Sequence, residues 1–98
     1  MGQLNDVIHQ PVRLRIMATL NTLPPDEYID FVRLRAIVGA TEGNLGAHLS
    51  TLEKSEYIAV IKDHVGKKPR TQMQMTPSGR LAFEQHLIEL KALLSGSI

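Results

Sequence analysis

The sequence contains no cysteine, and it has no long apolar run. Without cysteine the chain can form no disulfide, no thiol redox centre and no thiolate metal site. No apolar stretch approaches the roughly 20 residues that a membrane-spanning helix needs. The amino terminus has neither the basic segment nor the apolar segment of a signal peptide. We therefore expect a cytoplasmic, soluble protein with no membrane partner.

The chain also has little net charge, because 11 lysines and arginines face 10 acids and leave +1 at pH 7. This near balance argues against a polybasic protein that binds polyanions through total charge, so distribution matters more. Between Lys62 and Arg80 there are five cations and one acid, Asp63. Acids gather around residues 26–30 and along the last part of the chain. Such a polarised domain suits a partner with one charged face.

Motifs of enzymes are missing as well. The chain has four scattered histidines, none of them paired at the i, i+4 spacing of a helical zinc site: His9, His48, His64 and His86. The glycines form neither a P-loop nor a dinucleotide-binding pattern, and no serine lies in a nucleophile elbow. We expect no catalytic residue, no metal and no cofactor. A metal site built from histidines and carboxylates across a dimer stays open as an alternative.

The length predicts a single domain, residues 1–98, and 43% hydrophobic residues suffice for a core. A domain of this size is only marginally able to stabilise itself, so oligomerisation would help. Helical patterns cover residues 4–9 and then run from Pro11 toward residue 23, followed by a very short strand at residues 28–29. Asp30 is placed to cap the next helix, and Gly39 is placed to end it.

A third helical pattern follows after a very short connection. Thr41 is the expected cap of a helix that covers residues 41–55, and residues 39–41 are about as short as a helix-turn-helix turn should be. One side of this helix is apolar: Leu45, Leu49 and Leu52. The opposite side is made mainly of small residues: Gly43, Gly46, Ala47, Ser50 and Lys54. Glycines in a helix cost roughly 1 kcal/mol each relative to alanine, so this face is unusual.

A face of small residues would let the helix lie deep in the major groove of DNA, which is only about 12 Å wide. Asn44, Thr51 and His48 would then reach base edges, and Ser50 and Lys54 would lie nearer phosphates. The alternative is a helix that packs closely against another part of the protein, such as a second subunit. Glu42 at the start of the helix complements the helix dipole.

A basic hairpin comes next, over residues 57–76. Its predicted turn, Gly66–Thr71, carries three cations and no acid: Lys67, Lys68 and Arg70. These cations could follow phosphates or enter a minor groove, whereas the alternative is a turn kept polar for solubility. Met73 and Met75 are expected on the core side. A helix-turn-helix followed by a basic hairpin indicates a winged-helix DNA-binding domain, with the hairpin as the wing.

The last helix, residues 77–94, has two apolar faces, although a surface helix of a monomer needs only one. The first face consists of Leu81, Ile88 and Ala92. The second face, which we assign to a dimer interface, consists of Phe83, Leu87, Leu90 and Leu94. A two-fold dimer would present two third helices, about one turn of DNA apart, to a palindromic site. A helix buried inside a monomer is the alternative.

Several segments resemble the ArsR/MarR-like winged-helix regulators. Residues 9–17 resemble their opening, and residues 42–53 resemble their recognition helix. Tyr57–Ile58, the Gly-Lys-Lys-Pro-Arg-Thr wing and Thr76–Arg80 complete a pattern that covers nearly the whole chain. The resemblance implies an α+β, mostly helical fold: a winged helix-turn-helix with a two-stranded β wing and a C-terminal dimerisation helix.

In function, the resemblance implies a homodimeric transcriptional regulator, often a repressor, bound to double-stranded DNA. It carries the groove role to Thr41, Asn44, Gly46, Ala47, His48 and Thr51, and the wing role to Lys67, Lys68 and Arg70. We also assign Thr71, the last residue of the predicted turn, to the DNA-binding wing. Some members of the group sense metals through cysteines, which this chain lacks. Others bind small molecules at the dimer interface, so an unidentified effector stays open. The competing hypothesis is a winged-helix module that binds proteins and not DNA, since the net charge is nearly neutral.

Overall fold

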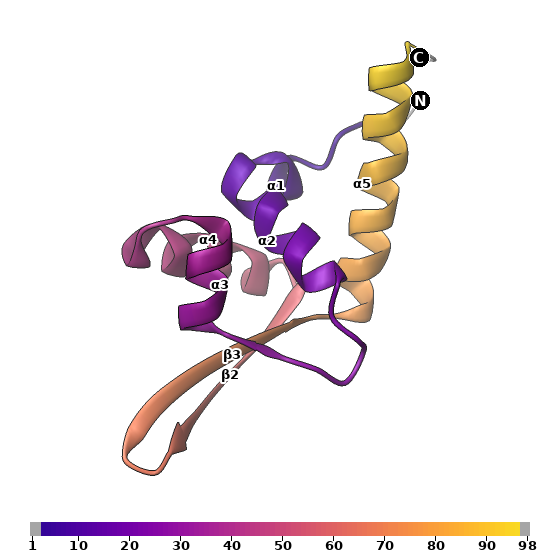
Figure 1. Ribbon diagram of the computed structural model, residues 1–98. Coiled ribbons are helices and arrows are strands. Elements are labelled where there is room, and N and C mark those ends of the chain that lie inside the picture. The colour runs from indigo at the N-terminus through magenta and orange to yellow at the C-terminus, as the bar shows by residue number, and fades with distance from the viewer. Residues whose placement is uncertain (1–2, 97–98) are drawn as a thin grey trace.

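The computed structural model describes residues 3–96 as a mostly helical α+β fold with a three-stranded antiparallel sheet (Figure 1). In chain order the elements are α1 (Asp6–His9), α2 (Pro11–Asn21), β1 (Ile29–Asp30), α3 (Phe31–Val38), α4 (Glu42–Lys54), β2 (Ile58–Val65), β3 (Lys68–Met75) and α5 (Pro77–Ser95). The predicted mostly helical α+β fold with a C-terminal helix is confirmed, while dimerisation through that helix stays a prediction. Residues 1–2 and 97–98 of the predicted domain lie outside the described range. No helix within residues 3–96 is long and apolar enough to cross a membrane.

Side-chain caps fix where the helices begin. Asp30 accepts a hydrogen bond from an amide in the first turn of α3, and Thr41 and Thr76 do the same for α4 and α5. Each oxygen satisfies one of the amides that the first helical turn leaves without a partner. The predicted caps Asp30 and Thr41 are therefore confirmed. Pro11 occupies the first position of α2, where its missing N–H costs nothing.

The connection between α3 and α4 is as short as predicted. Gly39 ends α3 in the left-handed conformation at φ 75°, which an L side chain adopts only with strain. Its amide donates to the carbonyl oxygen of Arg35 at 2.8 Å. Helix α4 starts at Glu42, immediately after its cap. This tight turn holds α3 and α4 as a helix-turn-helix.

The sheet has the order β1-β3-β2, and the hairpin pairs Ile58 with Met75 through to Val65 with Lys68. The predicted hairpin is confirmed, but its predicted turn was too long. Only residues 66–67 connect the strands, because Gly66 at φ 63° reverses the chain at once. Pro69 lies within β3, beyond the two residues that β1 pairs, where β3 is an edge strand and tolerates proline.

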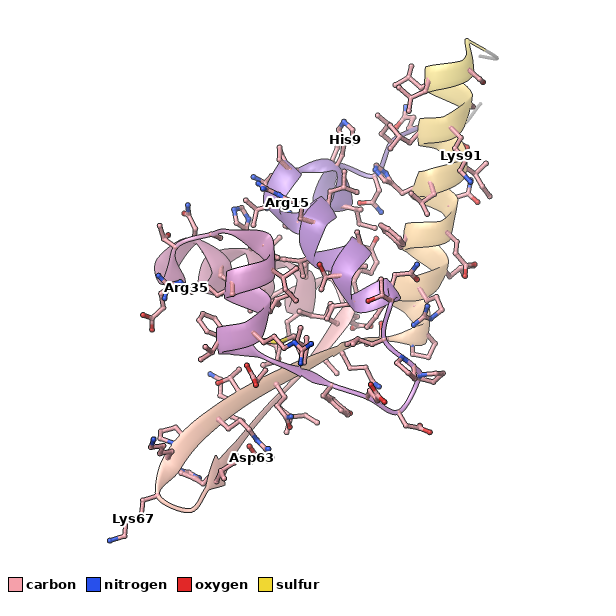
Figure 2. All side chains as sticks on the ribbon, viewed as in Figure 1. His9, Arg15, Arg35, Asp63, Lys67 and Lys91 are labelled. Carbon is pink, nitrogen blue, oxygen red and sulfur yellow. The ribbon has the colours of Figure 1, made fainter. Side chains whose placement is uncertain are left out.

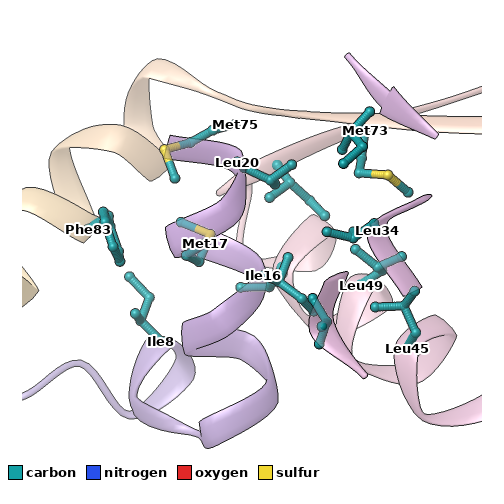
Figure 3. Packing of buried hydrophobic residues seen from close by; sticks show 14 residues of the cluster. Ile8, Ile16, Met17, Leu20, Leu34, Leu45, Leu49, Met73, Met75 and Phe83 are labelled. Carbon is teal, nitrogen blue, oxygen red and sulfur yellow. The ribbon is translucent and has the colours of Figure 1, made fainter. Parts of the chain in front are cut away.

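The core is assembled from every helix and strand (Figure 3). Its buried apolar members are Ile8, Ile16, Met17, Leu20, Ile29, Leu34, Val38, Leu45, Leu49, Leu52, Ile58, Met73, Met75 and Phe83. Met73 and Met75 face inward from β3 as predicted, while Gln74 donates to the carbonyl oxygens of Pro25 and Glu27. Because α4 contributes a single leucine ridge to this core, its opposite face stays free.

Helix α5 begins against the backbone of Tyr57, the residue before β2, and then leaves the body of the protein. A Cβ atom on Gly79 would lie 1.9 Å from the carbonyl oxygen of Tyr57, so the close start of α5 requires glycine. In Figure 1, α5 and the hairpin project in opposite directions from the helices α1–α4. The molecule is accordingly elongated, with extents of 53 × 26 × 21 Å.

Candidate nucleic-acid interface

Helix α4 faces the core on one side and solvent on the other. Leu45, Leu49 and Leu52 are at most 5% exposed. The exposed residues of α4 and its cap include Thr41, Glu42, Gly43, Asn44, Gly46, Ala47, Ser50 and Lys54. Thr51 is half-buried, and its hydroxyl donates to the carbonyl oxygen of Ala47 at 3.3 Å. Most of the predicted groove residues therefore lie on one open surface.

The two glycines of α4 have no packing role within the described chain. A Cβ atom built on Gly43 or Gly46 would meet no atom within 4 Å. Alanine would therefore fit at both positions, and in a helix interior it is favoured by about 1 kcal/mol. This contrasts with Gly79, where a Cβ atom would collide with the backbone. Close packing of α4 against its own chain, one of the alternatives raised above, is excluded over residues 3–96.

His48 lies at the edge of this surface. It is half-buried beside α2, and Nη1 of Arg13 lies 3.0 Å from its Nδ1. Burial, and then the charge of Arg13, lowers the pKa of His48 below its usual value. Arg13 also donates from Nε to the carbonyl oxygen of Val7. A cation of α2 thus holds a side chain of α4, a contact that helical periodicity did not predict.

The hairpin extends away from the body and ends in a lysine. Lys67 occupies the turn, and Figure 2 places its side chain at the far end of the hairpin. Lys68 is exposed at the start of β3. Both ammonium groups are free to meet an anion, because neither forms an ion pair within residues 3–96.

Arg70 is not the bare cation that the sequence suggested. Its Nε and Nη2 donate to the two carboxylate oxygens of Asp63 at 2.9 and 2.7 Å, across the hairpin. The hydrogen bond to Arg70 is the main reason that the pKa of Asp63 lies below its usual value. Antiparallel register places the two residues directly opposite each other, although seven positions separate them in the sequence. The hairpin therefore offers fewer unpaired cations than its predicted turn implied.

An open groove joins α4 to the hairpin. Its volume is about 260 Å³, with Gly46, Ser50 and Glu53 on the α4 side and Lys62 and Thr71 on the strand side. The predicted wing residue Thr71 thus lies in this groove, half-buried, and not at the tip. Lys62, which the sequence offered only as part of a charge count, lines the same groove.

Helix α3 contributes a further cation that the sequence reading missed. Arg35 is exposed, and its Nε donates to the carbonyl oxygen of Ala40 at 3.2 Å, in the turn before α4 (Figure 2). Its guanidinium therefore lies beside the amino-terminal end of α4. The position of Arg35 in the last turn before Gly39 was the available signal. Arg80, counted earlier among the cations near the hairpin, instead donates to Oδ1 of Asn21 at 2.8 Å.

The same combination of elements characterises a known family. The family described as the winged helix DNA-binding domain matches residues 12–94. The chain belongs to this family. In winged-helix terms, α3 and α4 form the helix-turn-helix and the β2–β3 hairpin takes the place of the wing, while the role of α4 as recognition helix stays a prediction.

Individual relatives agree with this assignment. Over 87 residues the winged-helix chain is 31% identical to an uncharacterised protein of Methanocaldococcus jannaschii, covering 89% of this chain and 91% of that protein. A solved structure of a transcriptional regulator homologue from Pyrococcus horikoshii OT3 is 30% identical, with a TM-score of 0.80 over 92% of this chain and 86% of the other. A possible transcriptional regulator from Methanosarcina mazei Go1 shares the fold at 15% identity, with a TM-score of 0.60 over 94% of this chain and 82% of the other. The ArsR/MarR-like subtype stays a prediction.

The face of α5 that we assigned to a dimer interface is largely turned toward the protein's own core. Phe83 is only 3% exposed, because it packs in the core of its own chain, and Leu87 packs against the same core. The opposite face is open, with Leu81 and Ile88 at 70% and 59% exposure. Leu94 follows the inward ridge of Phe83 but is 78% exposed, because α5 has left the body by then (Figure 1). Periodicity found two faces correctly but did not tell which of them the domain covers.

Two of the four histidines meet between α1 and α5. His86 is 1% exposed, and its Nδ1 accepts a hydrogen bond from the amide of Asn5 at 3.1 Å. Its Nε2 lies 3.4 Å from Nδ1 of His9. An Nδ1 that accepts leaves the hydrogen on Nε2, so this pair is a hydrogen bond and not a pair of metal ligands. No group of three or more metal-binding side chains occurs within residues 3–96.

Proposed function

We propose that this winged-helix protein is a sequence-specific transcriptional regulator, a repressor, which acts as a homodimer on a palindromic DNA site. One observation carries the proposal: the exposed face of α4 is built from small residues that no neighbour in the described chain requires. A helix that gives up stability in this way without any internal gain is suited to a close external contact. The major groove, about 12 Å wide, provides such a contact.

In this proposal, some side chains of the DNA-binding surface contact phosphates and others contact bases. Lys67 and Lys68 on the wing and Arg35 beside the amino-terminal end of α4 suit phosphates, which fix register but carry little sequence information. Asn44 and Thr51 on α4 suit base edges, where sequence is read. Phosphate contacts then provide most of the affinity, and this contribution falls as salt rises.

The homodimer is proposed from the exposed end of α5. Ile88, Leu93 and Leu94 are 59%, 49% and 78% exposed on a helix that extends past its own domain. Large apolar side chains exposed on several sides of a projecting helix favour a partner surface, and a second copy supplies an identical one under two-fold symmetry. Two recognition helices would then face successive major grooves about 34 Å apart. An unidentified small-molecule effector stays a prediction from the ArsR/MarR resemblance.

The dimer is tested by placing a charge at the end of α5. Leu94→Glu should shift the protein from dimer to monomer in analytical ultracentrifugation, because an acid would be buried against an apolar partner. Ile37→Glu is the matched control: Ile37 is 55% exposed on α3, so the same kind of change should leave the sedimentation coefficient unaltered. A wild type that sediments as a monomer at micromolar concentration would refute the homodimer.

Protein docking without DNA is the second candidate. The net charge of +1 and the Arg70–Asp63 pair, which removes one free cation from the wing, favour it. A docking module should bind its protein partner with little dependence on salt, and loss of the wing lysines should not matter. The two candidates thus differ in one measurable quantity, the salt dependence of binding to DNA.

The deciding experiment is fluorescence anisotropy on a pool of random duplexes across a salt series. We compare wild type with the Lys67→Ala/Lys68→Ala variant and with Lys91→Ala, a matched lysine on α5 that Figure 2 places at the opposite end of the molecule. The wing variant should bind more weakly, and its salt slope should fall by about one unit for each lost phosphate contact. Lys91→Ala should behave like wild type. Absence of binding by wild type at low salt would instead make docking the leading function.

A further inference from the structure

The contact between Arg13 and His48 decides which atom of His48 the recognition helix offers to a ligand. A guanidinium has only donors, so Nδ1 of His48, 3.0 Å from Nη1 of Arg13, must accept. The hydrogen of the neutral ring then lies on Nε2. The lowered pKa of His48, caused by burial and by Arg13, favours this neutral ring.

The remaining nitrogen of His48 is free. Within residues 3–96, Nε2 of His48 has no hydrogen-bond partner. Every buried side-chain nitrogen and oxygen atom in that range does have a partner, so Nε2 is not a buried atom. The atom is therefore reached by solvent. Because Nδ1 and Nε2 lie on different sides of the imidazole ring, the N–H at Nε2 points away from Arg13.

His48 also has the right neighbours for a role in recognition. Asn44, His48 and Thr51 follow one another at i, i+4 and i+7, so they form one ridge along α4. The hydroxyl of Thr51 donates internally to Ala47, which leaves Thr51 only its lone pairs. Asn44 offers both an amide donor and a carbonyl acceptor, so His48 is the side chain of this ridge that can only donate.

We propose that Arg13 is a positioning residue that holds His48 in its Nε2–H tautomer, so that the recognition helix selects a hydrogen-bond acceptor at one base of its DNA site. The acceptors available in the major groove are N7 of purines, O6 of guanine and O4 of thymine. Arg13 itself is held by its bond to the carbonyl oxygen of Val7, which keeps its guanidinium against His48. This inference rests on the proposed DNA-binding function.

The test combines a binding selection with a spectroscopic measurement. Random duplexes are selected with wild type, Arg13→Met, His48→Ala and the matched control Arg15→Met, and the bound pools are sequenced. Arg15 is exposed on the same helix, and its Nε donates only to the carbonyl oxygen of Pro11, so the control removes an equal charge without touching α4. In parallel, the ¹⁵N chemical shifts of His48 report which ring nitrogen carries the hydrogen.

Wild type should show the hydrogen on Nε2 of His48. Arg13→Met and His48→Ala should both lose preference at the same single position of the site, by roughly two- to tenfold, the effect of one hydrogen bond. Arg15→Met should keep that preference. Arg13→Lys, which restores a donor, should recover it.

A hydrogen on Nδ1 of His48 in wild type would overturn the inference. If wild type selects a defined sequence and Arg13→Met keeps the same preference at every position, the inference is overturned as well. If wild type selects no sequence, the proposed function and this role of Arg13 are overturned together. That outcome is read from the wild-type selection alone and needs no variant. If Arg13→Met does not fold, the wild-type spectrum and the His48→Ala selection still decide.

Discussion

Replacing Gly46 with alanine should make the protein more stable and a poorer ligand for DNA. Gly46 lies in the interior of α4, where glycine costs about 0.8–1.0 kcal/mol relative to alanine. A Cβ atom at this position meets nothing within 4 Å, so no collision offsets the gain. For a domain of this size, 1 kcal/mol corresponds to a rise in Tm of about 4–8 °C.

The binding loss should grow with the size of the new side chain. Gln is nearly as good a helix former as Ala, so Gly46→Gln should keep most of the stability gain. Its longer side chain would however be forced between α4 and the groove wall. If the contact is as close-packed as a protein core, overpacking costs about 1–3 kcal/mol, or roughly a 5- to 150-fold weaker Kd.

Thermal unfolding at one fixed protein concentration and DNA titration at one salt concentration measure the two effects separately. Ser78→Gln is the control, because it adds the same side chain at an exposed position of α5. Only the Gly46 variants should lose affinity. A Gly46→Gln protein with raised Tm and wild-type affinity would refute the argument, since the small-residue face of α4 would then not contact DNA.

Three further changes test other parts of the structure. Gly79→Ala should lower the free energy of unfolding by at least about 1–3 kcal/mol in urea, because its Cβ atom would lie 1.9 Å from the carbonyl oxygen of Tyr57; an unchanged urea midpoint would contradict this close contact. His86 has a pKa lowered first by burial and then by its histidine neighbour, so the unfolded chain takes up its proton at higher pH than the folded one. The stability that neutral His86 contributes is therefore present above about pH 6.5 and is lost as pH falls through the folded pKa. Between pH 7.5 and 5 the urea midpoint should fall less steeply in His86→Asn than in wild type. Parallel curves for the two proteins would argue against a lowered pKa of His86. Asp63→Asn should release Arg70, so DNA affinity at low salt should rise and the salt slope should steepen; an unchanged slope would mean that the paired arginine does not face DNA.

Helix boundaries were predictable because their causes are local. The caps Asp30 and Thr41 and the terminator Gly39 act within one turn of backbone, and each was identified correctly from its neighbours. The leucine ridge of α4 and the small-residue face opposite it also followed from helical spacing alone. The helix-turn-helix and the surface proposed to meet DNA were therefore visible in the sequence.

Contacts between elements were not predictable in this way. The hairpin register pairs Arg70 with Asp63, and the packing of α2 on α4 brings Arg13 to His48. Neither contact leaves a periodic signal, because the partners lie on different elements. Reading charge along the chain therefore overestimated the free positive charge of the wing and overlooked the contact that holds His48.

Helix α5 shows which features the sequence determines and which depend on the tertiary structure. The sequence by itself determined that α5 forms and that it has two apolar faces, because a helix needs only local hydrogen bonds and its spacing is fixed. Only the tertiary structure decided that Phe83 faces the core, that Leu94 lies beyond it, and that His86 meets Asn5 from 81 positions away. Burial depends on which surfaces meet when the whole chain closes around its core, and no local stretch of sequence contains that information.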